Sequence, residues 1–413
     1  MPPYSANLPL SPRALVFLLG ALVAFGPLSI DMYLPALPAI GAALGVEPGA
    51  VHFTVSAFLA GFCVGMVLTG PLSDRFGRRP LLVGGLVLYV VASIACALAP
   101  GIESLIAGRF VQAVGGGAVA VTGRAVVRDV FATADSARVL SLMQIVTLVA
   151  PLVAPIMGGY LAALFGWRVI FVFLGAFGGL CFVAVLLRLP ETRAEVSTPE
   201  TLSMMSLLRD YARILGHGRS LALILGGAAS FAGMFAYISA SPFVYIDHFG
   251  VNREHFGYFF GLNAFGIMLA ATINARYVRK LGVRKMLRTG GVLAMVSGVV
   301  LAVLGSQPTV SLFEVAAPLF VFVSVTGLIG ANCVAQLFAL HEQRAGTAAA
   351  AFGAVQFALG ACVSAALGLI NDRTPAGMSV AIGACGLGVV LALYVGTRAP
   401  RGADLPAAQK CPS

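Results

Sequence analysis

The sequence contains very little charge for its length. Of its 413 residues, 10% are Asp, Glu, Lys or Arg and 59% are hydrophobic, whereas soluble domains have about 25% charged residues. A soluble protein of this composition would have too little polar surface to stay dispersed in water. We therefore exclude a soluble fold and expect the chain to lie in a lipid bilayer.

The sequence also lacks the residue patterns of enzymes and of metal or cofactor sites. Its seven cysteines show no CxxC spacing, and six lie in apolar runs, where a free thiol behaves as a small hydrophobic group. No HExxH, GxSxG or phosphate-binding loop is present. We therefore expect no disulfide, metal site or cofactor, and no use of ATP. These absences argue against the rival class of a membrane-embedded enzyme.

Apolar runs fill the chain instead. A helix needs about 20 apolar residues to cross the hydrocarbon layer, and twelve runs meet this requirement. They predict an all-α membrane protein with twelve transmembrane helices. The runs lie at 13–39, 51–71, 80–99, 104–126, 138–163, 168–189, 219–244, 254–276, 285–305, 311–340, 346–370 and 378–397.

The net charge of +10 is unevenly distributed between the connections. If the N-terminus is cytoplasmic, all but four of the 26 basic residues lie on the cytoplasmic side. The exceptions are Arg109, Arg168, Arg253 and Arg373. This asymmetry follows the positive-inside rule and predicts that both termini are cytoplasmic. A nucleic-acid surface would need basic residues gathered on a water-exposed domain, so we expect no nucleic-acid partner.

The longest polar stretch, residues 190–218, divides the chain near its midpoint. We expect an N-terminal six-helix bundle at 1–189, a cytoplasmic linker at 190–218, a C-terminal six-helix bundle at 219–397 and a cytoplasmic tail at 398–413. The second part of the linker, "LSMMSLLRDYARIL", has helical periodicity and is expected to lie along the membrane surface.

The stretch "GPLSDRFGRRP" at 70–80 is the strongest motif. It has an echo in "ARYVRKLGVRK" at 275–285, which suggests that the two bundles are related. Its glycines permit a tight turn, and it places one acid among three cations. A basic cytoplasmic loop explains the cations alone. The functional alternative is a gate in which Asp74 faces the positive end of a helix from the other half. The residues of this cytoplasmic gate motif are Gly70, Asp74, Arg75, Gly77, Arg78, Arg79 and Asp129.

This motif closely resembles the loop signature of the major facilitator superfamily. "RFVQAVGG" (109–116) resembles the family's Arg-x-x-Gln-Gly element, and "APLVAPIMGG" (150–159) resembles its antiporter element. Ala113 and Ala154 stand where glycines are usual. "SIDMYLPALP" (29–38), with "FAGMF" and "PFVYI" further on, resembles the Bcr/CflA drug exporters and their bicyclomycin-resistance members.

The resemblance implies two pseudo-repeated six-helix bundles around a central cavity that opens alternately to each side. It implies a monomeric, proton-coupled multidrug antiporter in the bacterial inner membrane, with amphipathic antibiotics, protons and lipid as its partners. A proton-coupled importer or metabolite exporter of the same fold is the alternative, as is a non-transporting sensor. The antiporter residues are expected to form a bend that seals the cavity or to serve ordinary helix packing: Pro151, Pro155, Gly158 and Gly159.

Asp31 is the only charged residue between Ala14 and Val46. A carboxylate in hydrocarbon costs roughly 2.5–3.5 kcal/mol on insertion scales, and protonation removes most of this cost. Asp31 is therefore a candidate proton carrier in the cavity, unless it ends the first span in water. Arg109 has the same two alternatives: it faces the cavity near Asp31, or it extends to the outer headgroups.

Other polar residues within the spans are expensive against lipid, whereas the aromatic residues of the seventh span either line the cavity or lie in the core or against lipid. We expect them to line the substrate cavity, although bridging between helices and packing in the core are the alternatives. The candidates are Tyr33, Gln112, Phe235, Tyr237, Asn263, Asn332, Gln336 and Gln356.

Overall fold

The computed structural model describes residues 11–131, 133–192, 204–341, 344–370 and 374–397. Within these ranges every regular element is a helix. Twelve helical stretches are long and apolar enough to cross a membrane, and each overlaps one of the predicted runs. The prediction of twelve transmembrane helices is therefore confirmed. The proposed tail at 398–413 lies outside the described residues.

The first half of the chain forms six spans, of which the first is broken. Its elements are α1 (Pro12–Asp31), η2 (Leu34–Ala36), α2 (Leu37–Leu44), α3 (Pro48–Phe76), α4 (Arg78–Ala97), α5 (Ile102–Val130), α6 (Thr133–Phe165) and α7 (Arg168–Arg188).

The second half begins with a short helix, α8, and then forms six further spans. Its elements are α8 (Met204–Gly216), α9 (Gly218–Pro242), η3 (Phe243–His248), α10 (Arg253–Leu281), α11 (Val283–Gly305), α12 (Leu312–Leu340), α13 (Ala345–Ile370) and α14 (Pro375–Gly396).

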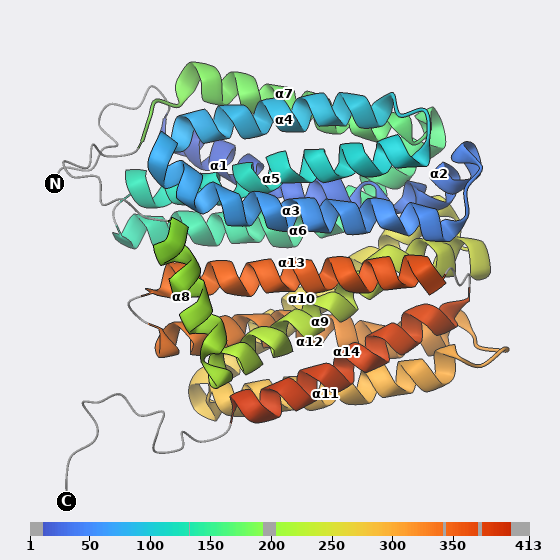
Figure 1. Cartoon of the computed structure of the whole chain (residues 1–413). Helices are drawn as coiled ribbons and strands as arrows, with labels where there is room; N and C mark the ends of the chain where they lie inside the picture. Colours follow the sequence, from blue (N-terminus) through green and yellow to red (C-terminus); the bar gives the residue numbers. More distant parts are fainter. Residues whose placement is uncertain (1–10, 132, 193–203, 342–343, 371–373, 398–413) are drawn as a thin grey trace, which may run out of the picture.

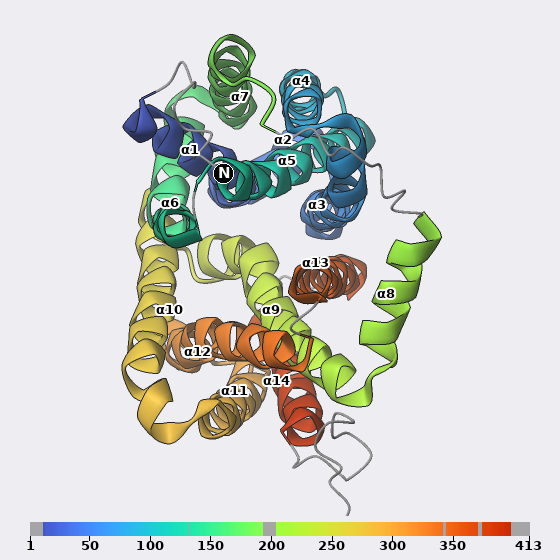
Figure 2. The same cartoon turned by 90° about the vertical axis from the view of Figure 1, so that its left-hand side faces the viewer.

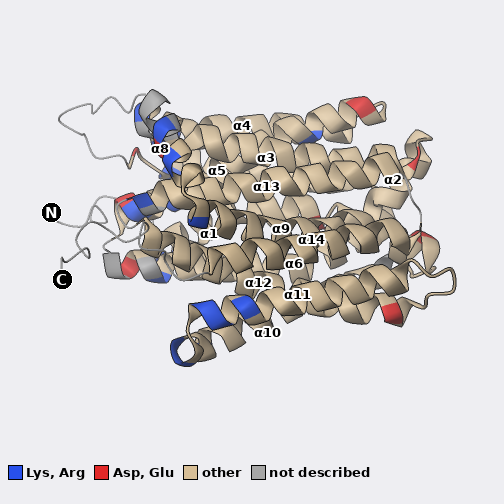
Figure 3. Cartoon of the chain, turned by 60° about the horizontal axis from the view of Figure 1, so that its bottom comes forward, with Lys and Arg blue, Asp and Glu red and all other residues tan. Residues whose placement is uncertain are grey.

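The spans form two groups that lie side by side. Helices α1–α7 make one group and α9–α14 the other, and the groups meet where α3 packs on α13 and α6 packs on α10 (Figure 2). Helix α8 crosses the ends of the spans on the side where the chain begins (Figure 1). We call this side, where α1 begins and α14 ends, the terminal end and the opposite side the distal end. Most described Lys and Arg residues gather at the terminal end (Figure 3).

The two halves repeat each other in their second and third spans. Both bounds of α10 (253 and 281) equal those of α3 (48 and 76) plus 205. The turns that flank these helices repeat as well, because Gly45 and Gly250 have φ of 65° and 69°, and Gly77 and Gly282 have φ of 95° and 80°. Such left-handed backbone is accessible to glycine at little cost. The weak repeat in the sequence therefore corresponds to a repeat in the structure.

The gate motif is more helical than the sequence analysis predicts. Helix α3 continues through the motif to Phe76, so only Gly77 separates it from α4. The expected turn-forming role of Gly70 is wrong: it lies inside α3, and an added Cβ would meet nothing within 4 Å. One glycine with positive φ suffices to reverse the chain, so the second glycine is not needed for the turn.

The first span is broken near its distal end. Helix α1 stops at Asp31, and the chain passes through the short helix η2 into α2. Helix α6 covers this break closely, since a Cβ added to Gly158 would overlap the carbonyl oxygen of Met32. Irregular backbone is tolerated at membrane depth only where protein covers it. Gly158 therefore permits the close approach that keeps lipid from the break.

We expect Gly158→Ala to destabilise the protein, because backbone atoms on both sides of the contact cannot move aside. Overpacking of this kind costs about 1–3 kcal/mol. Gly179→Ala in α7 is the matched control, since no atom lies within 4 Å of its added Cβ, and Ala there should add about 0.5–1 kcal/mol of helix stability. The melting temperatures of both variants in detergent test this, and equal values would contradict the packing role of Gly158.

Candidate substrate and proton site

Asp31 lies at a helix end and is buried at the same time. It is the last residue of α1, and its exposed fraction is only 4%. The two alternatives from the sequence are therefore not exclusive, because this helix end lies inside the protein. The C-terminus of a helix is the negative end of its dipole, so it does not stabilise a carboxylate. Burial and the dipole together make the charged form of Asp31 costly.

The carboxylate of Asp31 is close to the second half of the chain. It lies within electrostatic range of Tyr237 on α9. The Tyr237 hydroxyl accepts a hydrogen bond from Asn263 Nδ2 of α10 at 3.0 Å. The other polar atom of that amide, Asn263 Oδ1, is buried and has no partner among the described residues. Asp31, Tyr237 and Asn263 thus place acceptor and hydroxyl groups from both halves near one another.

Arg109 does not pair with Asp31. The ion pairs between described side chains involve Arg78, Arg213 and Arg344, and none reaches Asp31. Arg109 is 1% exposed, so it does not extend to the headgroups either. Neither an ion pair with Asp31 nor contact with the outer headgroups therefore describes the surroundings of Arg109.

Arg109 is held by the first half of the chain. Its Nη1 donates to Gln112 Oε1 at 2.7 Å, and its Nη2 donates to the backbone carbonyl of Ser29 at 3.0 Å. Ser29 is in the last turn of α1, where carbonyl groups lack partners within the helix. A cation at this position is favourable for the helix dipole. Arg109 therefore caps the helix end at which Asp31 lies.

Aromatic rings surround the guanidinium of Arg109. Its central carbon lies 4.5 Å from the ring centre of Tyr33, 4.2 Å from that of Phe58 and 5.7 Å from that of Phe171. Such contacts stabilise a cation that has lost its water. The Tyr33 hydroxyl is 2.7 Å from Thr54 Oγ1. Tyr33, a predicted cavity residue, therefore belongs to the surroundings of Arg109.

Gln112 bridges helices within the first half. Its Oε1 accepts from Arg109, and its Nε2 donates to Ser93 Oγ on α4 at 2.8 Å. Both ends of the amide are thus occupied by protein groups. This geometry favours the bridging alternative for Gln112 over direct contact with a substrate.

The predicted cavity residues of α12 and α13 lie in different places. Asn332 Nδ2 donates to Asn274 Oδ1 at 2.7 Å and so links α12 to α10. Gln336 accepts from Arg219 at 3.2 Å near the terminal end. Gln356 is partly exposed on α13. Only part of the predicted set therefore gathers around Asp31.

A row of phenylalanines joins the two halves. The ring of Phe62 on α3 lies 4.9 Å from Phe357 on α13, which lies 5.2 Å from Phe231 on α9. Phe235, a predicted cavity residue, lies 4.7 Å from Phe231. Phe62 and Phe357 cannot be identified from the sequence, because single phenylalanines within apolar runs have no distinguishing pattern.

The gate motif forms a network at the terminal end. Arg78 Nε pairs with Asp129 Oδ2 of α5 at 2.8 Å. The carboxylate of Glu191 accepts from the backbone N–H of Arg78 at 2.9 Å and of Arg79 at 3.1 Å. A negative charge at a helix N-terminus is favourable, so Glu191 stabilises the start of α4. Glu191 follows the sixth span, and no sequence motif marks it as part of this network.

Asp74 and Arg75 of the gate motif lie near the end of α3. Arg75 is exposed in the last turn of α3. Asp74 lies in the same helix, but its side chain is outside the described part of the structure. Its expected contact with the second half therefore stays a prediction.

The antiporter residues lie in a wall shared by both halves. Pro151 and Pro155 are inside α6, and Gly159 is buried beside Gly158. Gly158 faces the break of the first span, whereas Ile156 packs against Gly257 of α10 in the second half. An added Cβ at Gly257 would lie 2.7 Å from the Ile156 side chain. Helix α6 thus packs against both the first span and α10 toward the distal end.

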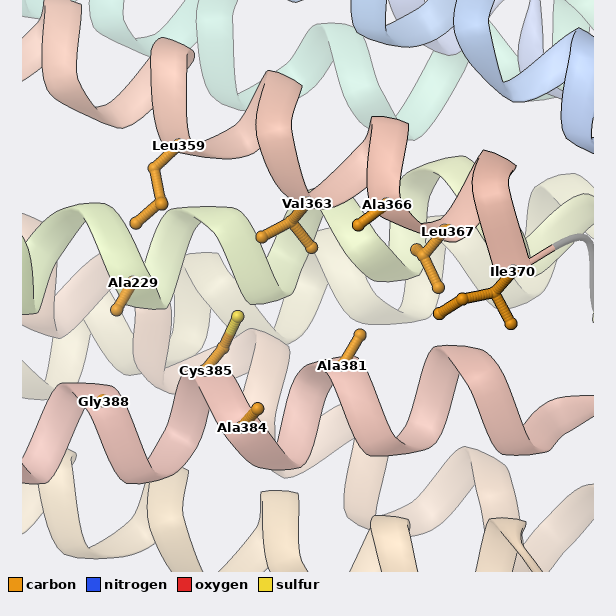
Figure 4. A pocket seen from close by; sticks show the side chains of 10 residues that line it. All are labelled: Ala229, Leu359, Val363, Ala366, Leu367, Ile370, Ala381, Ala384, Cys385 and Gly388. Atoms are coloured by element: carbon orange, nitrogen blue, oxygen red, sulfur yellow. The ribbon is translucent and has the colours of Figure 1, made fainter.

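A separate apolar cavity of about 320 Å³ lies between α9, α13 and α14 (Figure 4). Its lining is entirely of small or aliphatic side chains, among them Leu359, Val363 and Cys385. Ala366 and Ala384 at its edge are exposed on the outer surface of the bundle. The cavity is therefore on the lipid-facing side and not at Asp31. Among the described residues, no group of three His, Cys, Asp or Glu side chains forms a metal site.

Twelve membrane-spanning helices in two related halves, with a buried acid at their contact, define a membrane transporter. The sequence profile of the Major Facilitator Superfamily matches residues 17–369. The chain belongs to this superfamily.

Relatives and a solved structure agree with this assignment. The chain is 32% identical over 380 residues to a bicyclomycin resistance protein homologue of Haemophilus influenzae, covering 92% of this chain and 95% of that protein. It is 30% identical to the multidrug resistance protein MdtL of Citrobacter koseri, covering 71% of this chain and 74% of that protein. The crystal structure of a D-xylose–proton symporter has the same fold, with a TM-score of 0.72 at 16% identity and coverage of 92% and 95%.

Arg109→Lys tests the capping role of Arg109. The lysine keeps the charge but cannot reach Gln112 and the Ser29 carbonyl together. We expect a loss of about 1.5–3 kcal/mol, the contribution of one hydrogen bond to a charged group. Arg213→Lys on the surface of α8 is the control, with an unchanged melting temperature. Full stability of Arg109→Lys with loss of transport would instead assign the guanidinium to transport alone.

A histidine pair at the terminal end predicts a pH effect. His341 Nε2 lies 2.7 Å from Ser220 Oγ, which lies 2.9 Å from His217 Nδ1. Burial lowers the pKa of His341 below its ordinary value of 6.5, and His217 and Arg344 act in the same direction. Above this ordinary value the histidine is neutral whether the chain is folded or unfolded. As the pH falls below it, the unfolded chain binds the proton more readily, so stability is lost.

We therefore expect acidification from about pH 7.5 to about pH 5.5, a range that brackets the ordinary imidazole value, to lower the melting temperature. The decrease should be larger in the native protein than in His341→Gln. His255→Gln, at an exposed position on α10, should behave like the native protein. An identical pH response in native protein and His341→Gln would show that another group causes the loss.

Proposed function

We propose that this chain is a proton-coupled antiporter that exports amphipathic antibiotics across the bacterial inner membrane, as a monomer surrounded by lipid. The single observation that supports the proposal best is Asp31, a buried carboxylate at the contact between the halves that forms no ion pair with any described side chain. The names of the relatives, which refer to bicyclomycin and multidrug resistance, support the substrate class.

The chemistry of Asp31 suits proton exchange. Water that reaches the carboxylate from one side permits its ionisation, and closure of the site restores the cost of the charge unless a proton neutralises it. A cationic or hydrogen-bond-donating drug compensates the charge in the same way. Proton and drug are then alternative partners of one acid, and their competition couples the two fluxes.

The orientation in this proposal places the terminal end in the cytoplasm. The concentration of Lys and Arg there supports it through the positive-inside rule (Figure 3). The contacts between halves described above lie from the distal end to the middle of the spans, so the outer side is closed. In this state the drug enters from the cytoplasm and meets the phenylalanine row, which offers apolar contact without directional demands. The gate network around Arg78 and Asp129 is proposed to close the cytoplasmic side in the other state.

Asp31→Asn tests the coupling. The amide has nearly the same size and needs no proton, so the fold should persist and gain stability from removal of the buried acid. Proton-driven drug export should fall to the background of empty vesicles, because an amide cannot exchange a proton. The measurements are drug export into everted vesicles with an imposed pH gradient and drug-induced proton release from the purified protein.

Two variants control this experiment. Asp31→Glu keeps an acid with one extra methylene and should retain partial export. Glu103→Gln removes an exposed acid of α5 and should export normally. Equal proton release from native protein and Asp31→Asn would place the coupling residue elsewhere. Proton exchange that does not respond to any drug would favour the alternative of a metabolite transporter. Proton-driven drug movement out of the everted vesicles would identify an importer.

A further inference from the structure

A buried chain of polar side chains links the two halves at the distal end. His52 Nδ1 on α3 lies 2.7 Å from Ser239 Oγ on α9. Ser239 Oγ lies 2.9 Å from Ser364 Oγ on α13. The exposed fractions are 3% for His52 and 0% for both serines. One titratable group of the first half is thus hydrogen-bonded into the second half, away from lipid and water.

The backbone around this chain is packed too closely for it to be incidental. The His52 ring centre lies 4.8 Å from that of Phe243. A Cβ added to Gly368 of α13 would lie 2.8 Å from the Gly49 carbonyl oxygen and 3.2 Å from His52 Cβ. Elements η2 and α2 of the first half also contact α9 and η3 of the second half at this end. The halves therefore cannot separate here without breaking the bond of His52.

Among the described residues, no charged side chain is bonded to His52, Ser239 or Ser364, and Asp31, the buried acid at the end of α1, is not one of their partners. Helix α2 has no titratable side chain, and Cys362, the titratable group on the described part of α13, is exposed. Tyr237 on α9 and Tyr245 on η3 are phenols. At the distal ends of these elements and of α3, the described charged or titratable groups are Glu47, Asp247 and His248, and all three are exposed. A protonated imidazole would therefore be a buried cation without a carboxylate among its bonded partners, which is costly.

We propose that neutral His52 closes the outer gate, defined as the contact of α3 with α9 and α13 at the distal end, and that a proton taken up there from outside holds this gate open. The proposal rests on the proposed transport function for its orientation. The neutral ring can donate or accept at Nδ1, so it completes the chain to Ser239 and Ser364 in either tautomer. The protonated ring still donates, but its charge must remain in water.

This device is distinct from the proton exchange at Asp31. Protonation of Asp31 removes a buried charge and so favours closure around it. Protonation of His52 creates a charge and so opposes closure. After drug release the outer gate would close only when His52 has lost its proton, so strong external acid slows the return step and the closed state is favoured near neutral pH.

The experiment measures the gate without any substrate. Hydrogen–deuterium exchange of peptides that cover residues 37–44 and 243–248 is followed in purified native protein, His52→Gln, His52→Ala and the exposed-residue control His255→Gln. Measurements are made at about pH 7.5 and about pH 5.5, on either side of the ordinary imidazole value, with exchange times scaled for the chemical rate. Melting temperatures confirm that each variant is folded.

In native protein and His255→Gln, acidification should increase exchange of both peptides. His52→Gln keeps a neutral hydrogen-bonding group, so exchange should be low at both pH values. His52→Ala removes the bond to Ser239, so exchange should be about two- to tenfold higher at both pH values, the population change that one hydrogen bond supplies. Ser364→Ala, which removes only the end of the chain, replaces His52→Ala if that variant does not fold, with a smaller increase.

An equal pH response of His52→Gln and native protein would overturn the role of the proton. Low exchange in His52→Ala would overturn the role of the gate contact. Neither result depends on drug transport, so failure of this proposal and failure of the antiport proposal are distinguishable. Everted vesicles add a second readout: strong acid on the side of the distal end should slow export in native protein and not in His52→Gln.

Discussion

The hydrocarbon layer requires every backbone N–H and C=O to be hydrogen-bonded inside the protein, and the structure depends on this constraint. It makes each span a helix and restricts every break to places that protein covers. The break after Asp31 is the clearest case. Gly158 lets the backbone of α6 approach Met32, and the Arg109 guanidinium bonds the Ser29 carbonyl that the end of α1 leaves without a partner. The antiporter motif and the buried arginine thus have a common structural purpose, which is to permit a helix end at membrane depth.

Two charged or titratable residues, Arg109 and Asp31, lie at the end of α1 in different surroundings. Arg109 is a permanent cation, and aromatic rings and two hydrogen bonds of its own half surround it, so it need not move when the halves separate. Asp31 lies two residues after Ser29, within electrostatic range of Tyr237 of the other half, and it has no such support. A group whose surroundings come from both halves changes its environment with every change of conformation. A group enclosed by one half does not, which is why we propose Asp31 rather than Arg109 as the group that exchanges a proton.

The contacts between the halves differ in chemistry from one end to the other. At the distal end a histidine and two serines join α3, α9 and α13, and glycines bring the helices together. In the middle the contact includes the row of phenylalanines and a bond from the Cys63 thiol to the Ala354 carbonyl. At the terminal end, basic residues bond acids on helices of the same half, as in Arg78 with Asp129. The proposed function requires the two ends to close in alternation. Short polar contacts fit this proposal because they break over small movements, and an apolar middle fits the proposed range of drugs.

The sequence by itself determined the twelve spans and their grouping, because apolar length and loop polarity are local properties that hydrocarbon enforces. It also identified Asp31, since a lone acid in an apolar run needs no partner to be noticed. Partners were decided only by the tertiary structure. Gln112 and Asn332 proved to be bonded within their own halves, Gly70 proved to be helical, and Glu191 was found at the start of α4. The bond between His52 and Ser239 joins residues 187 positions apart. No local pattern marks such pairs, because their contact exists only when two helices are packed against each other.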